Sequence, residues 1–457
     1  MDFTKVDALL EQSLPAMERD VKTLVDIPSV EAPAAGEGAP FGREVQRALK
    51  EALAICRDMG LETCDLDGYC GYADLVGASA EQVGVLGHLD VVPADAADWS
   101  HPPYCSETVD GRIYGRGTLD DKGPMVAALY GAKALVEAGI PLTKTVRFLF
   151  GCNEETGMAC MEHYLKCCPP PSCGFTPDAE WPLIVGEKGI LHYELSAAWE
   201  KAEGGARLGR LDCGAAANVI PAKAEAVLLS YDGPLPEAEG IRAVRSGNET
   251  RISAVGVAAH GSTPEEGDNA LTKLLRCLAG LSFGPAAAKS AVDTLARLTA
   301  DDCHGAGFGV AGEDELSRTT HAPTVCHFTE TGFSLICDMR FRLTDHKEKY
   351  IDLLTALAEK EGFTFTSHGA QDPLYLGGDH PLAGKLLTSY REVTGNMAEP
   401  IIIGGGTYAK VMPNFLAFGP EPYGEPARAH QADEFISREE LLNAAKIYAR
   451  AIARMAE

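Results

Sequence analysis

VGVLGHLD, residues 83–90, is an apolar run that ends abruptly in a histidine and an aspartate. A continuous apolar run of this length predicts a buried strand. Because residues i and i+2 of a strand point to the same side, His88 and Asp90 would emerge together at its end. An imidazole that ligates a metal usually donates its other N–H to a carboxylate, so His88 is a candidate ligand and Asp90 its partner. A polar, solvated strand end explains the same residues, and this stretch alone favours that simpler interpretation.

Helix-like and strand-like segments alternate around this run. Residues 41–59 and 122–140 carry apolar residues at helical spacing, and Gly60 and Gly139 are suited to end those helices. KTVRFLFGCNEETG, residues 144–157, reads as a strand that runs into a polar turn. We therefore predict an α/β domain with a mixed, mostly parallel sheet and helices on both faces. Ligands bind at the carboxyl ends of the strands in such sheets.

The pattern changes after about residue 186. AEAVLLSYDG and GFSLICDMRFRLT read as antiparallel strands, and residues 269–281 and 347–362 read as helices, which gives α+β character. Long helical patterns return near the C-terminus. The glycine- and alanine-rich GPAAAKSA, residues 284–291, is expected to be a surface loop.

These changes predict one domain that is interrupted by another. The first domain would comprise residues 1–186 and 377–457, and an inserted α+β domain would comprise residues 187–376.

The amino-acid composition indicates which classes of partner to exclude and in which cellular compartment the protein is expected. The chain has 40 Lys and Arg against 66 Asp and Glu residues, a formal net charge of −26. Nucleic acids and anionic membranes bind proteins through basic patches, so neither is expected as a partner of this acidic chain. No secretory signal opens the sequence, and no apolar run of about 18 residues occurs, so no membrane span is expected. Fourteen cysteines without a CxxC pair are typical of buried free thiols in a cytoplasmic protein.

Two acidic motifs are stronger candidates for metal binding or catalysis than the other segments. In GRGTLDDKG, residues 115–123, Asp120 and Asp121 precede a helix, where a carboxylate could bridge two cations or simply cap the helix. In NEETG, residues 153–157, two adjacent glutamates suggest that one binds metal while the other moves protons. A surface acidic turn is the alternative for NEETG.

Two further segments add candidate ligands. TPDAEW, residues 176–181, contains Asp178, and ARAHQADE, residues 427–434, contains His430. Each is weak evidence by itself, because a lone histidine is usually a surface or hydrogen-bonded residue. Catalytic metal sites nevertheless gather ligands in this way, from the ends of several strands.

Taken in this order, the five motifs resemble those of the dinuclear zinc metallopeptidase family of aminoacylase, glutamate carboxypeptidase and the desuccinylases. The similarity is greatest to its dipeptidase branch, of the peptidase V and carnosinase-like type. It extends to AAHGSTPEEGDNA in the middle of the chain and to GGGTYAKVMPN near its end, and so covers nearly the whole sequence. The resemblance implies a metal-dependent dipeptidase that binds two divalent ions, Zn with Mn or Co as alternatives.

The resemblance also implies a set of metal ligands. His88 and Asp178 would be the terminal ligands of one ion. Glu155 and His430 would be those of the other, and Asp120 would bridge both ions.

Other roles follow from the same resemblance. Glu154 would be the general base, Asp90 would orient the ring of His88, and the peptide between Asp120 and Asp121 would be cis. The inserted domain would be a lid, in which His260 polarises the scissile carbonyl. The residues implied for contact with the substrate carboxylate are Asn218, Arg340, Gly405, Gly406 and Thr407. Arginine suits that task because its guanidinium can form two parallel hydrogen bonds to a carboxylate, although an ordinary lid salt bridge is the alternative for Arg340.

The sequence departs from the family pattern at His327, Thr329 and Arg428, which leaves substrate preference open. A small peptide is the expected substrate, and the chain is expected to be a monomer or a homodimer, with the long insertion favouring a monomer. Deacylation of N-acyl amino acids, carboxypeptidase activity and an inactive metal- or peptide-binding relative are the alternatives.

Overall fold

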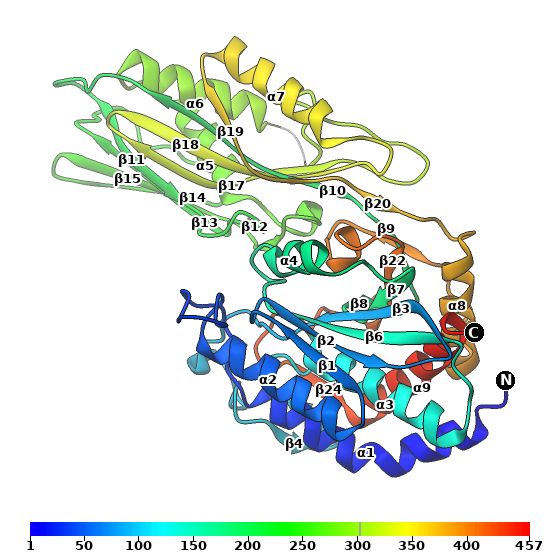
Figure 1. Cartoon of the computed structure of the whole chain (residues 1–457). Helices are drawn as coiled ribbons and strands as arrows, with labels where there is room; N and C mark the ends of the chain where they lie inside the picture. The colour runs from blue at the N-terminus through cyan, green and yellow to red at the C-terminus, as the bar shows by residue number, and fades with distance from the viewer. Residues whose placement is uncertain (301–302) are drawn as a thin grey trace. The chain divides into compact units, whose positions relative to one another are not determined.

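The computed structural model describes residues 1–300 and 303–457, which form two compact units (Figure 1). Unit 1 comprises Met1–Gly186, Tyr375–Ile401 and Thr407–Glu457. Unit 2 comprises Glu187–Leu374 and Ile402–Gly406. The sequence pattern gave no sign of the short return of residues 402–406 to unit 2.

Unit 1 is built on a mixed sheet with a parallel centre. The strand order is β1-β2-β6-β3-β7-β22-β9-β20, with β21 also paired to β9, and β6, β3, β7 and β22 are parallel neighbours. The strands of this sheet are β1 (Glu62–Leu66), β2 (Cys70–Leu75), β3 (Ser79–His88), β6 (Lys144–Gly151), β7 (Cys173–Thr176), β9 (Ile184–Glu187), β20 (Leu374–Tyr375), β21 (Ile401–Ile403) and β22 (Phe415–Ala417). Two small sheets accompany it: β8 (Ala179–Glu180) pairs with β23 (Pro420–Glu421), and β4 (Glu107–Val109), β5 (Arg112–Tyr114) and β24 (Phe435–Ser437) form the order β24-β5-β4.

Helices cover both faces of this sheet, as Figure 1 shows for α4 on one side and α3 and α9 on the other. The helices of unit 1 are α1 (Thr4–Val25), α2 (Arg43–Asp58), α3 (Lys122–Ala138), α4 (Ala159–Cys167), α8 (Pro381–Thr394) and α9 (Arg438–Met455). Helix α3 is buried along most of its length and contacts α1, α9 and β3. It ends at Gly139, which has φ +80°, a conformation that glycine adopts without a steric penalty. The predicted α/β fold is confirmed.

Unit 2 is an antiparallel sheet with helices packed against it, as the α+β prediction required (Figure 1). The strand order is β14-β15-β13-β11-β17-β18-β10-β19. The elements are β10 (Gly189–Ala198), β11 (Arg207–Cys213), β12 (Val219–Ile220), β13 (Lys223–Leu229), β14 (Ile241–Ser246), β15 (Glu249–Val255), β16 (Ala259–His260), α5 (Ala270–Ala279), α6 (Ala286–Leu298), β17 (Thr320–Thr329), β18 (Gly332–Phe341), α7 (Lys347–Glu361) and β19 (Thr364–Gln371). Side chains such as Leu228, Leu274 and Leu335 form its core.

The prediction of a surface loop at residues 284–291 is wrong. Helix α6 begins at Ala286, directly after Pro285, and continues to Leu298. Alanine has the highest helix propensity, and proline is tolerated at a helix start because its missing N–H would have no partner there. The buried Val292, Leu295 and Leu298 continue the apolar spacing beyond the stretch on which the loop was predicted.

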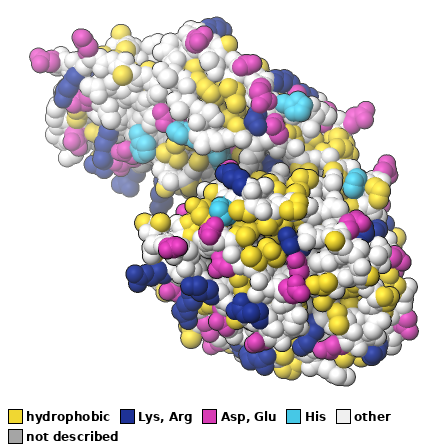
Figure 2. All heavy atoms as spheres, in the orientation of Figure 1, with side chains coloured by type: hydrophobic (Ala, Val, Ile, Leu, Met, Phe, Trp, Pro, Cys, Tyr) yellow, Lys and Arg dark blue, Asp and Glu magenta, His cyan; other side chains and the backbone are white. Residues whose placement is uncertain are grey.

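The helices and the charged side chains bear on the expected partners. Within residues 1–300 and 303–457, no helix is long and apolar enough to cross a membrane. Acidic and basic side chains both appear across the face shown in Figure 2.

Candidate metal centre

The carboxyl ends of three neighbouring parallel strands bring the acidic motifs together. His88 ends β3, Glu154 and Glu155 follow β6, and Asp178 follows β7. Strand β3 lies parallel to both β6 and β7, so the residues after all three strands meet at one edge. Most of these strands are buried, and His88 itself is only 1% exposed.

Asp120 lies between two histidines that come from distant parts of the sequence. Nε2 of His88 is 2.8 Å from Asp120 Oδ1, and Nε2 of His430 is 2.9 Å from Asp120 Oδ2. Each carboxylate oxygen therefore faces a different imidazole. Asp121 stands at the N-cap of α3 without a side-chain capping hydrogen bond, so helix capping does not account for this acidic pair. The peptide that joins Asp120 and Asp121 is cis, as the resemblance implied.

The other predicted ligands lie beside these histidines. Asp178 Oδ2 is 3.6 Å from His88 Nε2, and Glu155 Oε2 is 3.1 Å from His430 Nε2. Ligand atoms lie within 4.8 Å of one another in two groups: His88, Asp120 and Glu155, and His88, Glu154 and Asp178. Because Glu154 belongs to the second group, distance alone does not separate a base from a ligand.

Burial and neighbouring charges shift the pKa values of several groups in the cluster. Burial, reinforced by Asp120, raises the pKa of Asp178 to about 8. Burial, reinforced by Asp178, holds the pKa of Glu154 well above its usual range. Burial disfavours the charged form of His430, but hydrogen bonds to Asp120 and Glu155 outweigh it and raise its pKa to about 11. Buried carboxylates this close together favour a bound positive charge, which divalent cations would supply.

The donor set suits such cations. Imidazole nitrogen and carboxylate oxygen are ligands that Zn, Mn and Co all accept, and the cluster offers both types from several elements. The residues present therefore fit a divalent metal centre.

Asp90 contacts His88 differently from the expected arrangement. The closest acceptor to His88 Nδ1 is the backbone carbonyl of Asp90 at 2.8 Å, whereas the carboxylate oxygen Oδ1 is 3.7 Å away. The other carboxylate oxygen accepts a hydrogen bond from the backbone N–H of Glu155 at 3.1 Å. Asp90 thus contacts both the imidazole and the turn that carries the glutamates.

Glu434 is a buried acid that sequence reasoning missed. Its Oε1 accepts hydrogen bonds from the backbone N–H groups of Gly117, Leu119 and Asp120, at 2.9 to 3.2 Å. Its Oε2 lies 2.5 Å from Arg116 Nη1. Glu434 follows His430 by four residues, so it ties the loop of His430 to the loop of Asp120. Its only sequence signal was its place at the end of ARAHQADE.

Replacement of Glu434 should strongly destabilise unit 1. Glu434→Ala would leave a buried guanidinium and several buried N–H groups without their acceptor, and we expect the free energy of unfolding to fall by about 3–5 kcal/mol. Urea denaturation measures this loss. Glu11→Ala is a suitable control, because Glu11 is exposed and pairs with Lys446 on the surface, and its loss should stay below about 1 kcal/mol. Equal stability of the two variants would contradict the structural role of Glu434.

Unit 2 gathers most of the residues implied for substrate contact. His260 pairs in register with Val219, and the carbonyl of Asn218 accepts the N–H of Gly261 at 2.7 Å. Arg340 Nη1 donates to the carbonyl of Gly404 at 2.9 Å, directly before Gly405 and Gly406. Thr407 belongs to unit 1, where its hydroxyl accepts the N–H of Ala409.

Arg340 is already held by a salt bridge. Its Nε and Nη2 donate to the two carboxylate oxygens of the buried Asp338, at 2.6 and 2.8 Å. Both side chains are nearly inaccessible to solvent. A guanidinium has more N–H groups than these bonds and the bond to Gly404 use, so each terminal nitrogen retains an N–H for a further acceptor.

Two of the three residues that depart from the family pattern, Arg428 and His327, form ion pairs within the fold. Arg428 Nη2 donates to Glu440 Oε1 at 2.7 Å. His327, on β17, lies 3.2 Å from Asp212 on the exposed face of unit 2.

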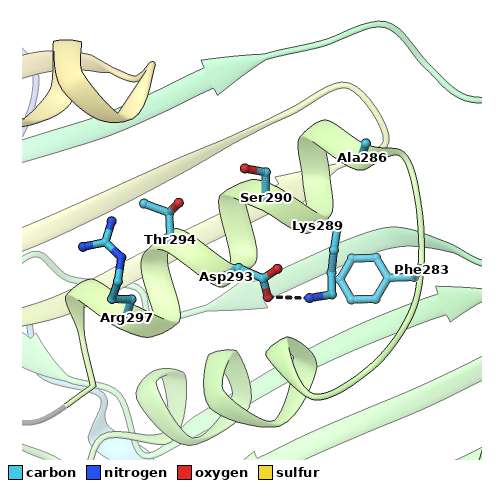
Figure 3. Close-up of a pocket in the computed structure, with 7 residues that line it drawn as sticks. All are labelled: Phe283, Ala286, Lys289, Ser290, Asp293, Thr294 and Arg297. Carbon is cyan, nitrogen blue, oxygen red and sulfur yellow. Dashed lines mark hydrogen bonds and ion pairs between the residues drawn. The ribbon is translucent and has the colours of Figure 1, made fainter.

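A separate hollow of about 590 Å³ lies along the outer face of α6 (Figure 3). An ion pair between Lys289 and Asp293 crosses it, and Phe283 and Arg297 lie at its ends. None of the predicted site residues lines this hollow, so we do not assign the predicted chemistry to it.

Comparison with known proteins agrees with the motifs. The model of peptidase family M20/M25/M40 matches residues 84–454. The chain is 33% identical to the putative dipeptidase YtjP of Bacillus subtilis, over 96% of this chain and 97% of that protein. It is also 33% identical to the Beta-Ala-Xaa dipeptidase of Lactobacillus delbrueckii subsp. lactis, over 97% of both chains.

The fold is also similar to that of a solved structure. The di-peptidase Dug1p from Saccharomyces cerevisiae superposes with a TM-score of 0.62 at 13% identity, covering 100% of this chain and 98% of that one. Both the sequence match and the fold therefore support one assignment: the chain belongs to peptidase family M20/M25/M40.

Proposed function

We propose that the chain is a dipeptidase that uses two divalent metal ions, Zn with Mn or Co as alternatives, to hydrolyse the peptide bond of small dipeptides. Family membership makes it a metal-dependent hydrolase. The dipeptide substrate is inferred from two relatives named as dipeptidases, which align over nearly their whole length. The observation that carries the two-metal proposal is Asp120, whose oxygens each face a different histidine among buried carboxylates.

The proposed ligands divide into two sets around Asp120. His88 and Asp178 would hold one ion, Glu155 and His430 would hold the other, and Asp120 would contact both. Support comes from the short distances between these side chains and from the charge that the carboxylates would otherwise concentrate in a buried place. Bound divalent ions supply Lewis acidity and lower the pKa of a coordinated water.

Glu154 is the proposed general base. Its carboxyl group lies beside His88 and Asp178, and burial, reinforced by Asp178, raises its pKa above the usual range, which favours uptake of a proton. Glu154 would accept a proton from the attacking water and deliver it to the departing amine. Asp90 would keep the ring of His88 and the turn of Glu155 in place.

The remaining predicted site residues would bind and polarise the substrate. His260 would donate a hydrogen bond to the scissile carbonyl oxygen as negative charge develops on it. Arg340, with Asn218, Gly405, Gly406 and Thr407, would bind the substrate carboxylate. In this proposal residues 1–186 and 377–457 form the catalytic domain and residues 187–376 form the lid.

A substrate panel tests the proposed function. Metal-depleted protein would be resupplied with Zn²⁺, Mn²⁺ or Co²⁺ and assayed on dipeptides, tripeptides and N-acyl amino acids. We expect hydrolysis only with metal present, and kcat/KM highest for dipeptides. Preference for N-acyl amino acids or longer peptides would instead indicate a deacylase or a carboxypeptidase. Metal binding without turnover of any substrate would indicate an inactive relative. Sedimentation of the same sample separates a monomer from a homodimer.

Arg340→Lys should weaken binding of peptides that carry a free C-terminal carboxylate. Lysine keeps the positive charge but loses the planar guanidinium, whose several N–H groups can bind Asp338 and the substrate carboxylate at the same time. We expect KM to rise about 10- to 100-fold for such peptides, with a much smaller change for C-terminally amidated ones. Arg342→Lys is the matched control, since Arg342 pairs with Asp345 at 2.8 Å. An equal rise for free and amidated peptides would contradict the assignment.

A further inference from the structure

We infer that Ser262 fixes His260 in the tautomer that carries its proton on Nε2, so that the imidazole presents a single directed N–H donor. The inference rests on the proposed function, because it specifies which ring nitrogen would donate to the scissile carbonyl. It makes Ser262 a positioning residue, which acts on substrate through His260.

Two contacts from Ser262 converge on the same ring nitrogen. The Ser262 hydroxyl lies 2.6 Å from His260 Nδ1, and the Ser262 backbone N–H donates to Nδ1 over 3.2 Å. A backbone N–H can only donate, so Nδ1 must be the acceptor in the second contact. A neutral imidazole has one N–H and one bare nitrogen, and the hydrogen bond at one nitrogen determines where the proton resides. The proton therefore resides on Nε2.

The backbone around Ser262 is held from several sides, which fixes the direction of its N–H. The carbonyl of Asn218 accepts the N–H of Gly261, and the carbonyl of His260 accepts the N–H of Thr263 at 3.1 Å. The Thr320 hydroxyl donates to the carbonyl of Ser262 at 3.4 Å. These contacts hold the turn that aims the Ser262 N–H at the ring.

The loop of Gly404 packs tightly against the same turn. A Cβ atom at Gly404 would lie 2.7 Å from Cβ of Ser262, which is closer than two carbon atoms can approach. Gly404 also accepts the hydrogen bond from Arg340. Because Gly404 has no side chain, its loop can contact both the turn that carries His260 and the guanidinium of Arg340.

Loss of the Ser262 hydroxyl should reduce turnover without weakening binding. In Ser262→Ala the backbone N–H still favours the Nε2–H tautomer, but one of the two donors to Nδ1 is gone. We expect kcat to fall about 3- to 10-fold with KM unchanged, because a fraction of rings would present a bare nitrogen to the carbonyl. Ser262→Thr keeps the hydroxyl and should restore most of kcat.

The direct test is nitrogen NMR of the histidine rings in uniformly ¹⁵N-labelled full-length protein. His260→Gln identifies the signals of His260, because they vanish in that variant. At a pH where the ring is neutral, we expect the wild-type spectrum to show a protonated Nε2 and an unprotonated Nδ1, and Ser262→Ala to shift both signals towards the average of the two tautomers. A wild-type ring protonated on Nδ1, or an unchanged spectrum in Ser262→Ala, would overturn the inference.

The same variants separate this inference from the proposed function. If His260→Gln leaves kcat unchanged, His260 has no role in turnover, whatever its tautomer. If His260→Gln lowers kcat but the wild-type ring is protonated on Nδ1, the catalytic role stands and the role of Ser262 fails.

Discussion

Glu154→Gln should lower kcat by about 10²- to 10⁴-fold while the protein keeps its bound metal. Glutamine has nearly the shape of glutamate but cannot accept a proton at neutral pH, so the variant removes proton transfer and little else. Turnover of a dipeptide and metal content by elemental analysis are the two measurements. Glu154→Ala should likewise lose turnover and keep its bound metal.

The adjacent glutamate provides the matched control. Glu155 Oε2 lies 3.1 Å from His430 Nε2, whereas Glu154 groups with His88 and Asp178. Glu155→Gln should therefore lose metal, and excess metal should recover part of its activity. Near wild-type turnover in Glu154→Gln, or equal loss of metal in both variants, would show that the roles of the two glutamates are assigned wrongly.

Asp120→Asn should impair the binding of both ions together. An amide offers one oxygen and no negative charge, so the substitution removes the contact on one side of Asp120 and weakens the other. Replacing a residue that merely orients a ligand typically costs 10- to 100-fold in metal affinity, and loss of a shared ligand should exceed about 100-fold. We expect the purified variant to contain little metal and to show activity near background.

Asp98→Asn serves as the control, because Asp98 is an exposed carboxylate in the same unit. Titration of metal-depleted protein with Zn²⁺, followed by calorimetry, measures the affinities of both variants. If Asp120→Asn loses only one ion and binds the other normally, Asp120 does not bridge the two sites.

The sequence predicted the parts of the site that local strand chemistry controls. His88, Glu154 and Asp178 follow apolar strands, and parallel pairing brings such strand ends together without further information. His430 comes from a segment more than 250 residues beyond Asp178 in the sequence, so only the order of motifs in a known family suggested that it belongs with them.

Long-range contacts could not be read from local pattern. Glu434 supports the loop of Asp120 across more than 300 residues of sequence, and no local spacing distinguishes it from a surface acid. Asp338 and Arg340 are two residues apart on β18, which predicts that they share a face but not that they pair. Helix α6 was missed because the buried residues of the Gly/Ala-rich stretch are alanines, and the larger apolar residues of its buried face come only after that stretch.

An anomalous difference map from crystals grown with Zn²⁺ tests the central claim most directly. The proposed two-metal site predicts two strong peaks on either side of Asp120, one contacted by His88 and Asp178 and the other by Glu155 and His430. Absence of a peak at His88, or a single peak that contacts only one oxygen of Asp120, would contradict it.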